Sequence, residues 1–196
     1  MYGIYENGGV IAKFVTPMSL LSNVPERVTD TLALGRSVMR RAAQRWELQT
    51  RLEPLSLDAN ELFANVVVAG HSQLITIVVP QNIGVLKKRT SVSSPTAVGA
   101  KGASAVTLSG NVGLIPRGTM IKFANHSKIY MATSSRDGNG ALGIFPTLRV
   151  AVSNITIAHR EDVIMNCYYD TDTVMGMAFE DGVLMDLGTV KLIEKI

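Results

Sequence analysis

Two neighbouring segments indicate a β-rich fold: Ala97-Val-Gly-Ala-Lys-Gly-Ala-Ser-Ala-Val-Thr-Leu108 and Leu114-Ile-Pro-Arg-Gly-Thr-Met-Ile-Lys-Phe-Ala-Asn-His-Ser-Lys-Ile-Tyr-Met131. Short apolar runs alternate in them with Gly, Pro, Asn and Ser, which are the residues of tight turns. The pattern predicts strands at about 105–108, 120–123, 128–133 and 141–145. Four or five short strands within about 55 residues, with glycine at the corners, are typical of a small closed barrel or an OB-like sheet.

The segments before and after this region also favour strands. From Trp46 to Arg51 apolar and polar residues alternate, which is the period of a half-buried strand. Residues 74–79 form a continuous apolar run rich in β-branched residues, as in a strand buried on both faces. After Pro146 we expect further strands at about 148–152, 156–159, 163–168, 176–179 and 190–193.

One short helix is predicted over residues 58–69. Asp58 can cap its first turn, Glu61 completes a capping box, and Gly70 supplies a stop. Residues 36–45 are compatible with helix or strand, and the alternation that follows them favours strand. The predicted fold class is therefore mainly β with one short helix.

The expected domain organisation has three parts. Residues 1–26, with two prolines between Thr16 and Pro25, are interpreted as an extended leader. Residues 27–89 and 150–196 are expected to form one β-domain, and residues 90–149 a small barrel inserted into it. The polar, proline-ended segment 87–95 has the composition of a connection between domains.

The composition excludes several classes of protein. Hydrophobic residues make up 46% of the chain and charged residues 18%, below the roughly 25% of an average domain, so we expect a packed fold with partly covered surfaces. No apolar run approaches the roughly 20 residues of a membrane span. The start of the sequence lacks the pattern of a signal peptide. These features predict a protein made in the cytoplasm without a membrane anchor.

Charge is distributed unevenly along the chain. Residues 1–89, 90–149 and 150–196 carry net charges of +3, +5 and −5. This asymmetry fits either solvated faces of strands or a self-complementary contact between subunits, and we expect the second. The candidate contact residues are Arg36, Arg40, Arg41 and Arg45 on the basic side and Glu180 and Asp181 on the acidic side.

One motif has the spelling of a nucleotide-binding loop. Gly138-Asn-Gly-Ala-Leu-Gly143 matches GxGxxG, but that loop requires a helix beginning at its last glycine. Here Ile144-Phe-Pro146 follows, and proline disfavours helix for the residue before it. We expect a hairpin turn and no cofactor.

Metal and catalytic sites are not indicated. Asp170-Thr-Asp begins like a calcium loop, but the later ligand positions hold Val174, Met175 and Gly182. The three histidines are isolated, no GxSxG motif is present, and Cys167 fits a small buried residue of a strand. We therefore expect no catalytic, cofactor-binding or metal-binding residues, and no enzyme activity.

Three features of the chain form a recognisable combination. They are the Trp46 strand that leads to Leu52-Glu-Pro-Leu55, the buried strand ending in Pro80-Gln81, and the middle region. In that region the relevant segments are Gly99-Ala-Lys-Gly-Ala103 before Val106-Thr-Leu108, Pro116-Arg-Gly-Thr-Met-Ile-Lys-Phe123, His126-Ser-Lys-Ile-Tyr130 and Phe145-Pro-Thr-Leu148. In these features, over about residues 27–196, the chain resembles the distal tail proteins of long-tailed bacteriophages.

The resemblance implies a tail-tube-like β-domain with an OB-like insertion, closed with copies of itself into a homohexameric ring around a DNA channel. It implies a virion protein of the tail, made in the host bacterial cytoplasm, whose neighbours are the tail tube protein and baseplate hub or tail-tip proteins. DNA would be passing cargo only. The leader over residues 1–26 departs from the family pattern.

Two alternatives remain open from the sequence. The chain could be another tail protein of the tube fold, such as a tube or terminator subunit. It could instead be a binding module, because OB-like barrels recognise carbohydrate or nucleic acid in other proteins.

Overall fold

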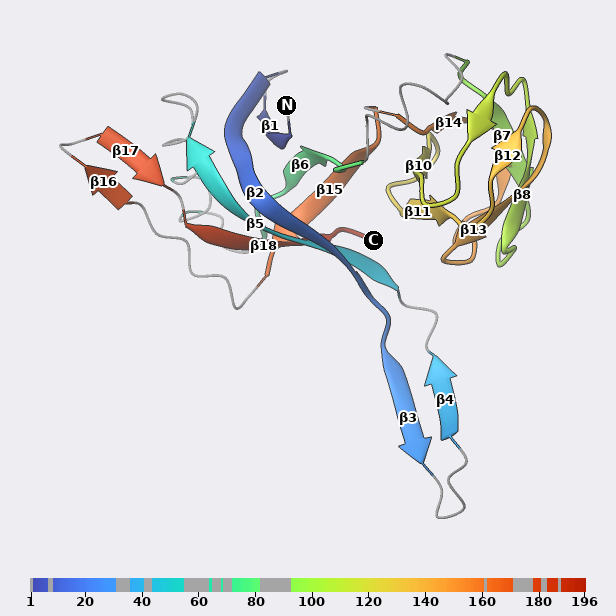
Figure 1. The fold of residues 1–196 in the computed structure, drawn as a ribbon, viewed down its shortest axis with the longest axis horizontal. Helices are drawn as coiled ribbons and strands as arrows, with labels where there is room; N and C mark the ends of the chain where they lie inside the picture. The colour runs from blue at the N-terminus through green and yellow to red at the C-terminus, as the bar shows by residue number, and fades with distance from the viewer. Residues whose placement is uncertain are drawn as a thin grey trace.

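The computed structural model describes residues 2–6, 9–30, 36–40, 44–54, 64, 68, 72–81, 93–160, 162–170, 178–180, 183–186 and 188–196. Within these residues the architecture is built from strands arranged in two closed barrels (Figure 1). None of the described residues belongs to a helix long and apolar enough to cross a membrane.

The first barrel has six antiparallel strands drawn from both ends of the chain. In order around the barrel they are β1 (Gly3–Glu6), β2 (Gly9–Asn23), β5 (Arg45–Pro54), β18 (Thr189–Glu194), β15 (Ile164–Tyr169) and β6 (Ile75–Val78). In β5 Trp46, Leu48 and Thr50 are buried and Gln49 and Arg51 are exposed, as the predicted alternation requires, but Glu47 of the polar face is buried as well. Trp46 and Leu48 pack with buried residues of the other five strands into one core.

The expected extended leader is wrong, because residues 3–23 form β1 and β2 of this barrel. β1 pairs with both β2 and β6 and so closes the barrel. Ile4 and Phe14 are 1% and 3% exposed in the core. β2 runs through Pro17, because a register shift against β5 between Val15 and Ser19 removes Pro17 from the ladder.

The second, small barrel also has six antiparallel strands. Their order is β10 (Met120–Phe123), β11 (Ile129–Ala132), β13 (Gly140–Phe145), β8 (Ala105–Ser109), β7 (Thr96–Gly99) and β14 (Val152–Ala158). Its core is centred on Phe123 and Tyr130, whose rings meet edge to face at 5.3 Å between centroids. The small barrel thus lies between β6 and β15 in the chain.

The expected end of the insertion at residue 149 is wrong. Strands at 148–152 and 156–159 were expected to rejoin the first domain, but β14 pairs with β7 and β10 of the small barrel. Val152 and Ile157 are buried in the small-barrel core. Without β14 the sheet would have two open edges, and its addition removes them.

Two other predicted elements meet different outcomes. The strand character predicted for residues 36–45 is confirmed for β4 (Arg36–Arg40). In the GxGxxG segment Gly138 and Asn139 form a bend between β12 (Arg136–Asp137) and β13, and the other four residues lie in β13. The expected hairpin is wrong, because β12 pairs with β9 (Leu114–Ile115) and not with β13. Gly138 and Gly140 adopt φ values of 65° and 124°, which favour glycine. The helix predicted over 58–69, apart from Ala64 and Val68, and residues 87–92 of the predicted connection lie outside the described residues.

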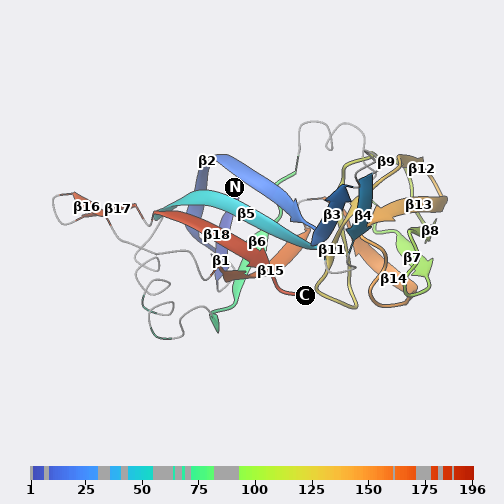
Figure 2. The same ribbon diagram turned by 90° about the horizontal axis from the view of Figure 1, so that it is seen from below.

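Three two-stranded sheets complete the described structure. One joins β12 to β9 (Leu114–Ile115) at the small barrel. The arm consists of β3 (Glu26–Asp30) and β4 and extends away from both barrels (Figure 1). The acidic hairpin consists of β16 (Ala178–Glu180) and β17 (Val183–Asp186). Figures 1 and 2 both place it at the end of the molecule farthest from the small barrel.

The role of β1 in barrel closure gives the first prediction. Ile4→Ala should lower the free energy of unfolding by about 2–5 kcal/mol, because it empties a fully packed core position. Lys13→Ala, in an exposed position of β2, should change it by less than about 1 kcal/mol. Urea unfolding measures both. Equal small losses would show that residues 1–26 lie outside the barrel, as an extended leader would.

Candidate functional site at the barrel junction

One buried carboxylate joins the two barrels. Glu194, at the end of β18, accepts hydrogen bonds from the backbone N–H groups of Trp46 at 2.9 Å and Ile129 at 2.7 Å. It also accepts one from Lys128 Nζ at 2.5 Å. The Glu194 and Lys128 side chains are 0% and 3% exposed. Because Glu194 and Trp46 belong to the first barrel while Lys128 and Ile129 belong to the small barrel, the bonds from Lys128 and Ile129 cross the junction.

Lys128 has a second partner in the first barrel. Its Nζ donates to Gln44 Oε1 at 2.7 Å, just before β5 begins. Burial lowers the pKa of Lys128, and the adjacent Glu194 carboxylate opposes that change only in part. Desolvation of two buried charges is costly, so the pair stabilises the junction only while both members and their hydrogen bonds are present.

Further contacts join the barrels around this pair. Trp46 Nε1 donates to the Ile129 carbonyl at 2.9 Å, and Met120 and Ile129 pack in the core cluster of the first barrel. Gln81, just after β6, accepts from Met120 N at 3.0 Å and donates to Met120 O at 3.3 Å. Lys122 Nζ donates to the Ile164 carbonyl at 2.8 Å. The junction therefore combines apolar packing with hydrogen bonds of fixed geometry.

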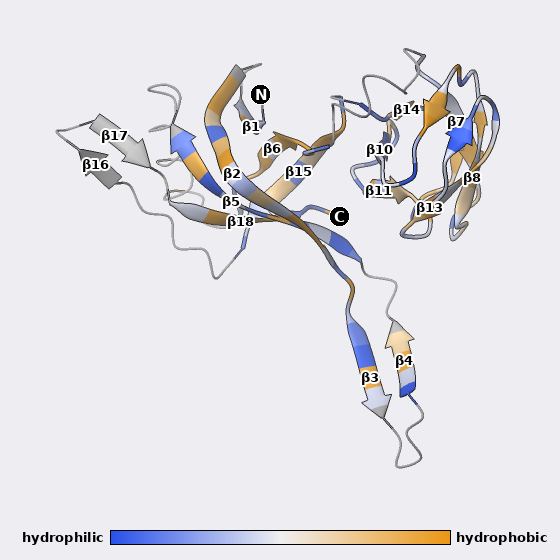
Figure 3. Ribbon diagram, viewed as in Figure 1, coloured by the Kyte–Doolittle hydropathy of each residue, from blue (hydrophilic) through white to orange (hydrophobic). Residues whose placement is uncertain are grey.

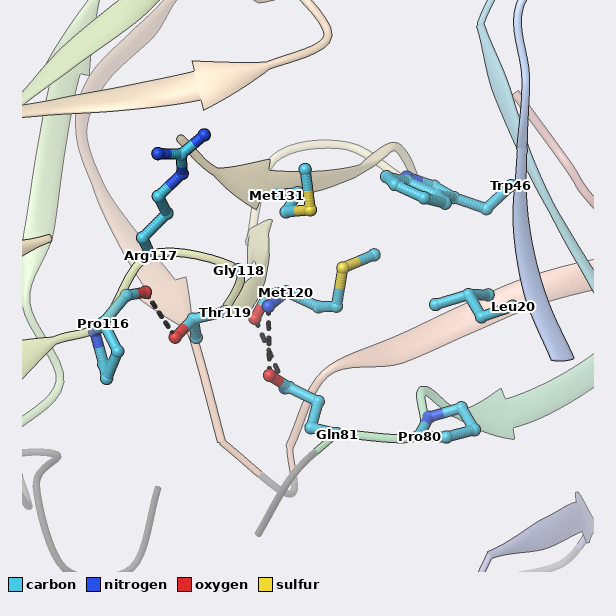
Figure 4. Close-up of a pocket in the computed structure, with 10 residues that line it drawn as sticks. All are labelled: Leu20, Trp46, Pro80, Gln81, Pro116, Arg117, Gly118, Thr119, Met120 and Met131. Carbon is cyan, nitrogen blue, oxygen red and sulfur yellow. Dashed lines mark hydrogen bonds between the residues drawn. The ribbon is translucent and has the colours of Figure 1, made fainter. Parts of the chain in front are cut away.

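A cavity of about 380 Å³ opens at this junction (Figure 4). It receives side chains from both barrels and from the segment before β10. We call it the junction cavity, and its lining residues are Leu20, Trp46, Pro80, Gln81, Pro116, Arg117, Gly118, Thr119, Met120 and Met131.

Cys167 and His126 both pack against core residues of a barrel. Cys167 is fully buried in β15, as predicted, and burial raises the pKa of its thiol. His126 packs edge to face against Phe123 and Tyr130. The pKa of His126 is lowered, mainly by burial and to a smaller extent by the positive charges of Lys122 and Arg149. Among the described residues no group of three His, Cys, Asp or Glu side chains is placed to hold a metal.

The predicted contact residues do not converge within one chain. Arg36 and Arg40 lie on β4 of the arm, Glu180 ends β16, and Arg41 and Asp181 lie outside the described residues. Figures 1 and 2 place β4 and β16 on different sides of the molecule, so a contact between them needs two chains.

Arg45 belongs to a charge network on the first barrel. Its Nε lies 3.0 Å from Glu47 Oε1, and Lys191 Nζ bridges Glu47 at 3.1 Å and Asp170 at 2.7 Å. Burial raises the pKa of Glu47, but hydrogen bonds from Asn23, Lys191 and Arg45 outweigh it, so the net pKa is lowered. Asp170, considered above as a calcium ligand, pairs here with Lys191, while residues 171–177 of that segment lie outside the described residues.

Sequence reasoning missed the Lys128–Glu194 pair and Gln81. One signal for Glu194 was present, because it continues the inward alternation of Val190 and Leu192 in β18. A carboxylate at an inward position of a strand requires donors, and it therefore marks a contact with another element.

The comparisons with known proteins give no further identification. No family model matches the chain, and no curated protein matches it.

The buried pair gives the second prediction. Glu194→Gln should lower the free energy of unfolding by about 3–5 kcal/mol, because Lys128 then remains charged and buried without a counter-ion. Adding Lys128→Met should recover part of that loss, with a coupling of about 1–3 kcal/mol in a double-mutant cycle. The control is Glu53→Gln, which removes the half-exposed partner of Lys13 and should cost less than about 1 kcal/mol. Additive effects at Lys128 and Glu194 would contradict the coupling.

The Glu47 network gives the third prediction. Because the folded pKa of Glu47 lies below its ordinary value of 4.5, this group stabilises the fold above that pH, and the contribution is lost as pH falls through the folded pKa. The difference in unfolding free energy between the wild type and Glu47→Gln should therefore shrink as pH is lowered from 7 to 3. Urea titrations across this range measure it. A difference that stays constant would show that the charge on Glu47 does not stabilise the fold.

Proposed function

We propose that this chain is a non-catalytic structural subunit of a phage tail, which forms a ring where the tail tube joins the baseplate or tail tip. The ring supports assembly and leaves a channel through which DNA passes. The proposal rests on the resemblance described above and on one structural observation, the arm. A closed domain with a projecting two-stranded arm is suited to contact with neighbouring copies.

The arm exposes apolar side chains far from either core. Val28, Val38 and Met39 are 42%, 46% and 68% exposed. Figure 3 shows apolar bands on both strands of the arm. A two-stranded hairpin is marginally stable in water by itself, and exposed apolar residues gathered on one element indicate a partner surface.

The register gives the two edges of the arm opposite charge. Glu26 lies opposite Arg40, Val28 opposite Val38, and Asp30 opposite Arg36. Since residues two apart share a face, this face has acidic residues along β3 and basic residues along β4.

A second arm laid beside the first would match this pattern. Its basic β4 edge would meet the acidic β3 edge, and the unpaired backbone groups of the two edges would hydrogen-bond. Such a contact uses two different surfaces of the same subunit, so repeating it closes a ring if the rotation closes. The same geometry favours self-assembly over a monomeric binding module.

The ring has defined neighbours in this proposal. The tail tube protein contacts one face and baseplate hub or tail-tip proteins contact the other. In this proposal the first barrel corresponds to the tail-tube-like domain, and the small barrel corresponds to the OB-like insertion.

Particle images of the purified full chain, combined with light scattering, test the proposal directly. We expect closed rings with an open centre. Stacked tubes would instead identify a tube subunit. A monomer that binds an oligosaccharide or oligonucleotide would contradict the ring and favour the binding module.

The arm gives the fourth prediction. Arg36→Glu with Arg40→Glu makes both edges acidic, and like charges across a contact cost several kcal/mol, so the protein concentration for half-assembly should rise at least about tenfold. The control, Lys101→Glu with Arg149→Glu, makes the same charge change at exposed positions of the small barrel. Adding Glu26→Arg and Asp30→Arg to the arm variant should restore assembly. If the arm and control variants assembled equally, the arm would not be the contact.

A further inference from the structure

We infer that the junction cavity is the seat for the acidic hairpin, β16 and β17, of a second copy of this chain. The inference rests on the proposed ring and adds a second contact between subunits, separate from the arm.

The junction cavity is suited to an apolar group. Its side walls are formed by Leu20, Trp46, Met120 and Met131 (Figure 4). Its neutral polar side chains already have partners within the chain. Both ends of the Gln81 amide bond Met120, and Thr119 Oγ1 donates to the Pro116 carbonyl at 2.7 Å. A polar ligand would have to break these bonds, whereas an apolar side chain would not.

The lining includes one charged residue, Arg117. It lies in the turn between β9 and β10 and is exposed. Within the described part of the chain its guanidinium has no ion pair, and no carboxylate residue lines the cavity. The cavity therefore fits an apolar group that is followed by a carboxylate.

The acidic hairpin has this composition. The sequence Ala178-Phe-Glu-Asp-Gly-Val-Leu-Met-Asp186 contains three carboxylate residues, no Lys or Arg, and three large apolar residues, Phe179, Leu184 and Met185. Its two strands pair with each other as a separate sheet. An apolar residue next to Glu180 and Asp181 complements an apolar cavity next to Arg117.

The arm does not offer the hairpin an equivalent partner. Arg36 and Arg40 each lie opposite a carboxylate residue of β3, and Arg45 is held by Glu47. The sequence-based pairing of these arginines with Glu180 and Asp181 is therefore less favourable than pairing with Arg117.

The two surfaces are arranged for contact between copies. The hairpin projects from the end of the molecule opposite to the small barrel (Figures 1 and 2). The cavity, in contrast, is lined by residues of both barrels. One chain cannot bring them together, and a head-to-tail neighbour can. At about 380 Å³ the cavity lies within the range of sites that bury a small ligand, which leaves room for large side chains.

A charge exchange tests the inference on the full chain. Arg117→Glu should raise the concentration for half-assembly about tenfold, and Glu180→Arg with Asp181→Arg should do the same. Combining all three substitutions should return assembly to within about threefold of the wild type. The control is Lys101→Glu, an equal charge change at an exposed turn of the small barrel. Light scattering over a concentration series gives each value.

Two outcomes separate this inference from the proposed function. If wild-type rings form but Arg117→Glu behaves like Lys101→Glu, or the exchange fails to restore assembly, the hairpin contact is wrong and the ring stands. If the wild type stays monomeric, both are wrong. Arg117→Cys with Glu180→Cys gives an independent readout, because oxidation should link neighbouring subunits into a ladder on a non-reducing gel. The control pair, Lys101→Cys with Glu180→Cys, should give no such ladder. A control ladder as strong as that of Arg117→Cys with Glu180→Cys would also overturn the inference.

Discussion

The carboxylate of Glu194 is the constraint on which the junction depends. A carboxylate that is fully removed from water must receive hydrogen bonds from the protein, because burying an unpaired charge costs far more free energy than one hydrogen bond contributes to stability. Its donors are Trp46 N in the first barrel and Lys128 and Ile129 N in the small barrel. Satisfying this group therefore requires the two barrels to be correctly folded and correctly placed at the same time.

The contacts around Glu194 fix the orientation of the small barrel relative to the first barrel. The Trp46 indole and the Gln81 amide bond the backbone of β11 and β10, so neither strand can slide without losing a hydrogen bond. The base of the arm continues from β2 and β5, which also supply Leu20 and Trp46 to the junction cavity. The arm and the cavity thus share one framework. In the proposed ring such a framework would be required, because ring closure tolerates little variation in the angle between the two contacts of a subunit.

Much of the fold could be predicted from local pattern, whereas its closure and its junction could not. Glycine-punctuated runs located β8, β10, β11 and β13, and alternation located the buried face of β5, because strand period and turn chemistry are local properties. The sequence did not assign β1, β2 and β14 to their barrels. A strand that closes a barrel pairs with whichever strands are left with a free edge, and local sequence does not show which strands those are. Pro17 and Pro25 favour an extended leader in the sequence, whereas in the fold a register shift accommodates Pro17 within β2. Lys128 and Glu194 are 66 positions apart, and no spacing rule connects them. The sequence shows only that Glu194 falls on the same face of β18 as the buried residues Val190 and Leu192.

The central claim is that the buried pair and its neighbours hold the two barrels as one rigid unit. Residual dipolar couplings of backbone amides, measured under conditions in which the chain is monomeric, test this most directly. If the barrels form one rigid unit, couplings from both barrels should fit a single alignment tensor, with equal magnitude and orientation, in the arrangement of the structure. Two tensors of different magnitude, one for each barrel, would show that the barrels reorient independently and would contradict it.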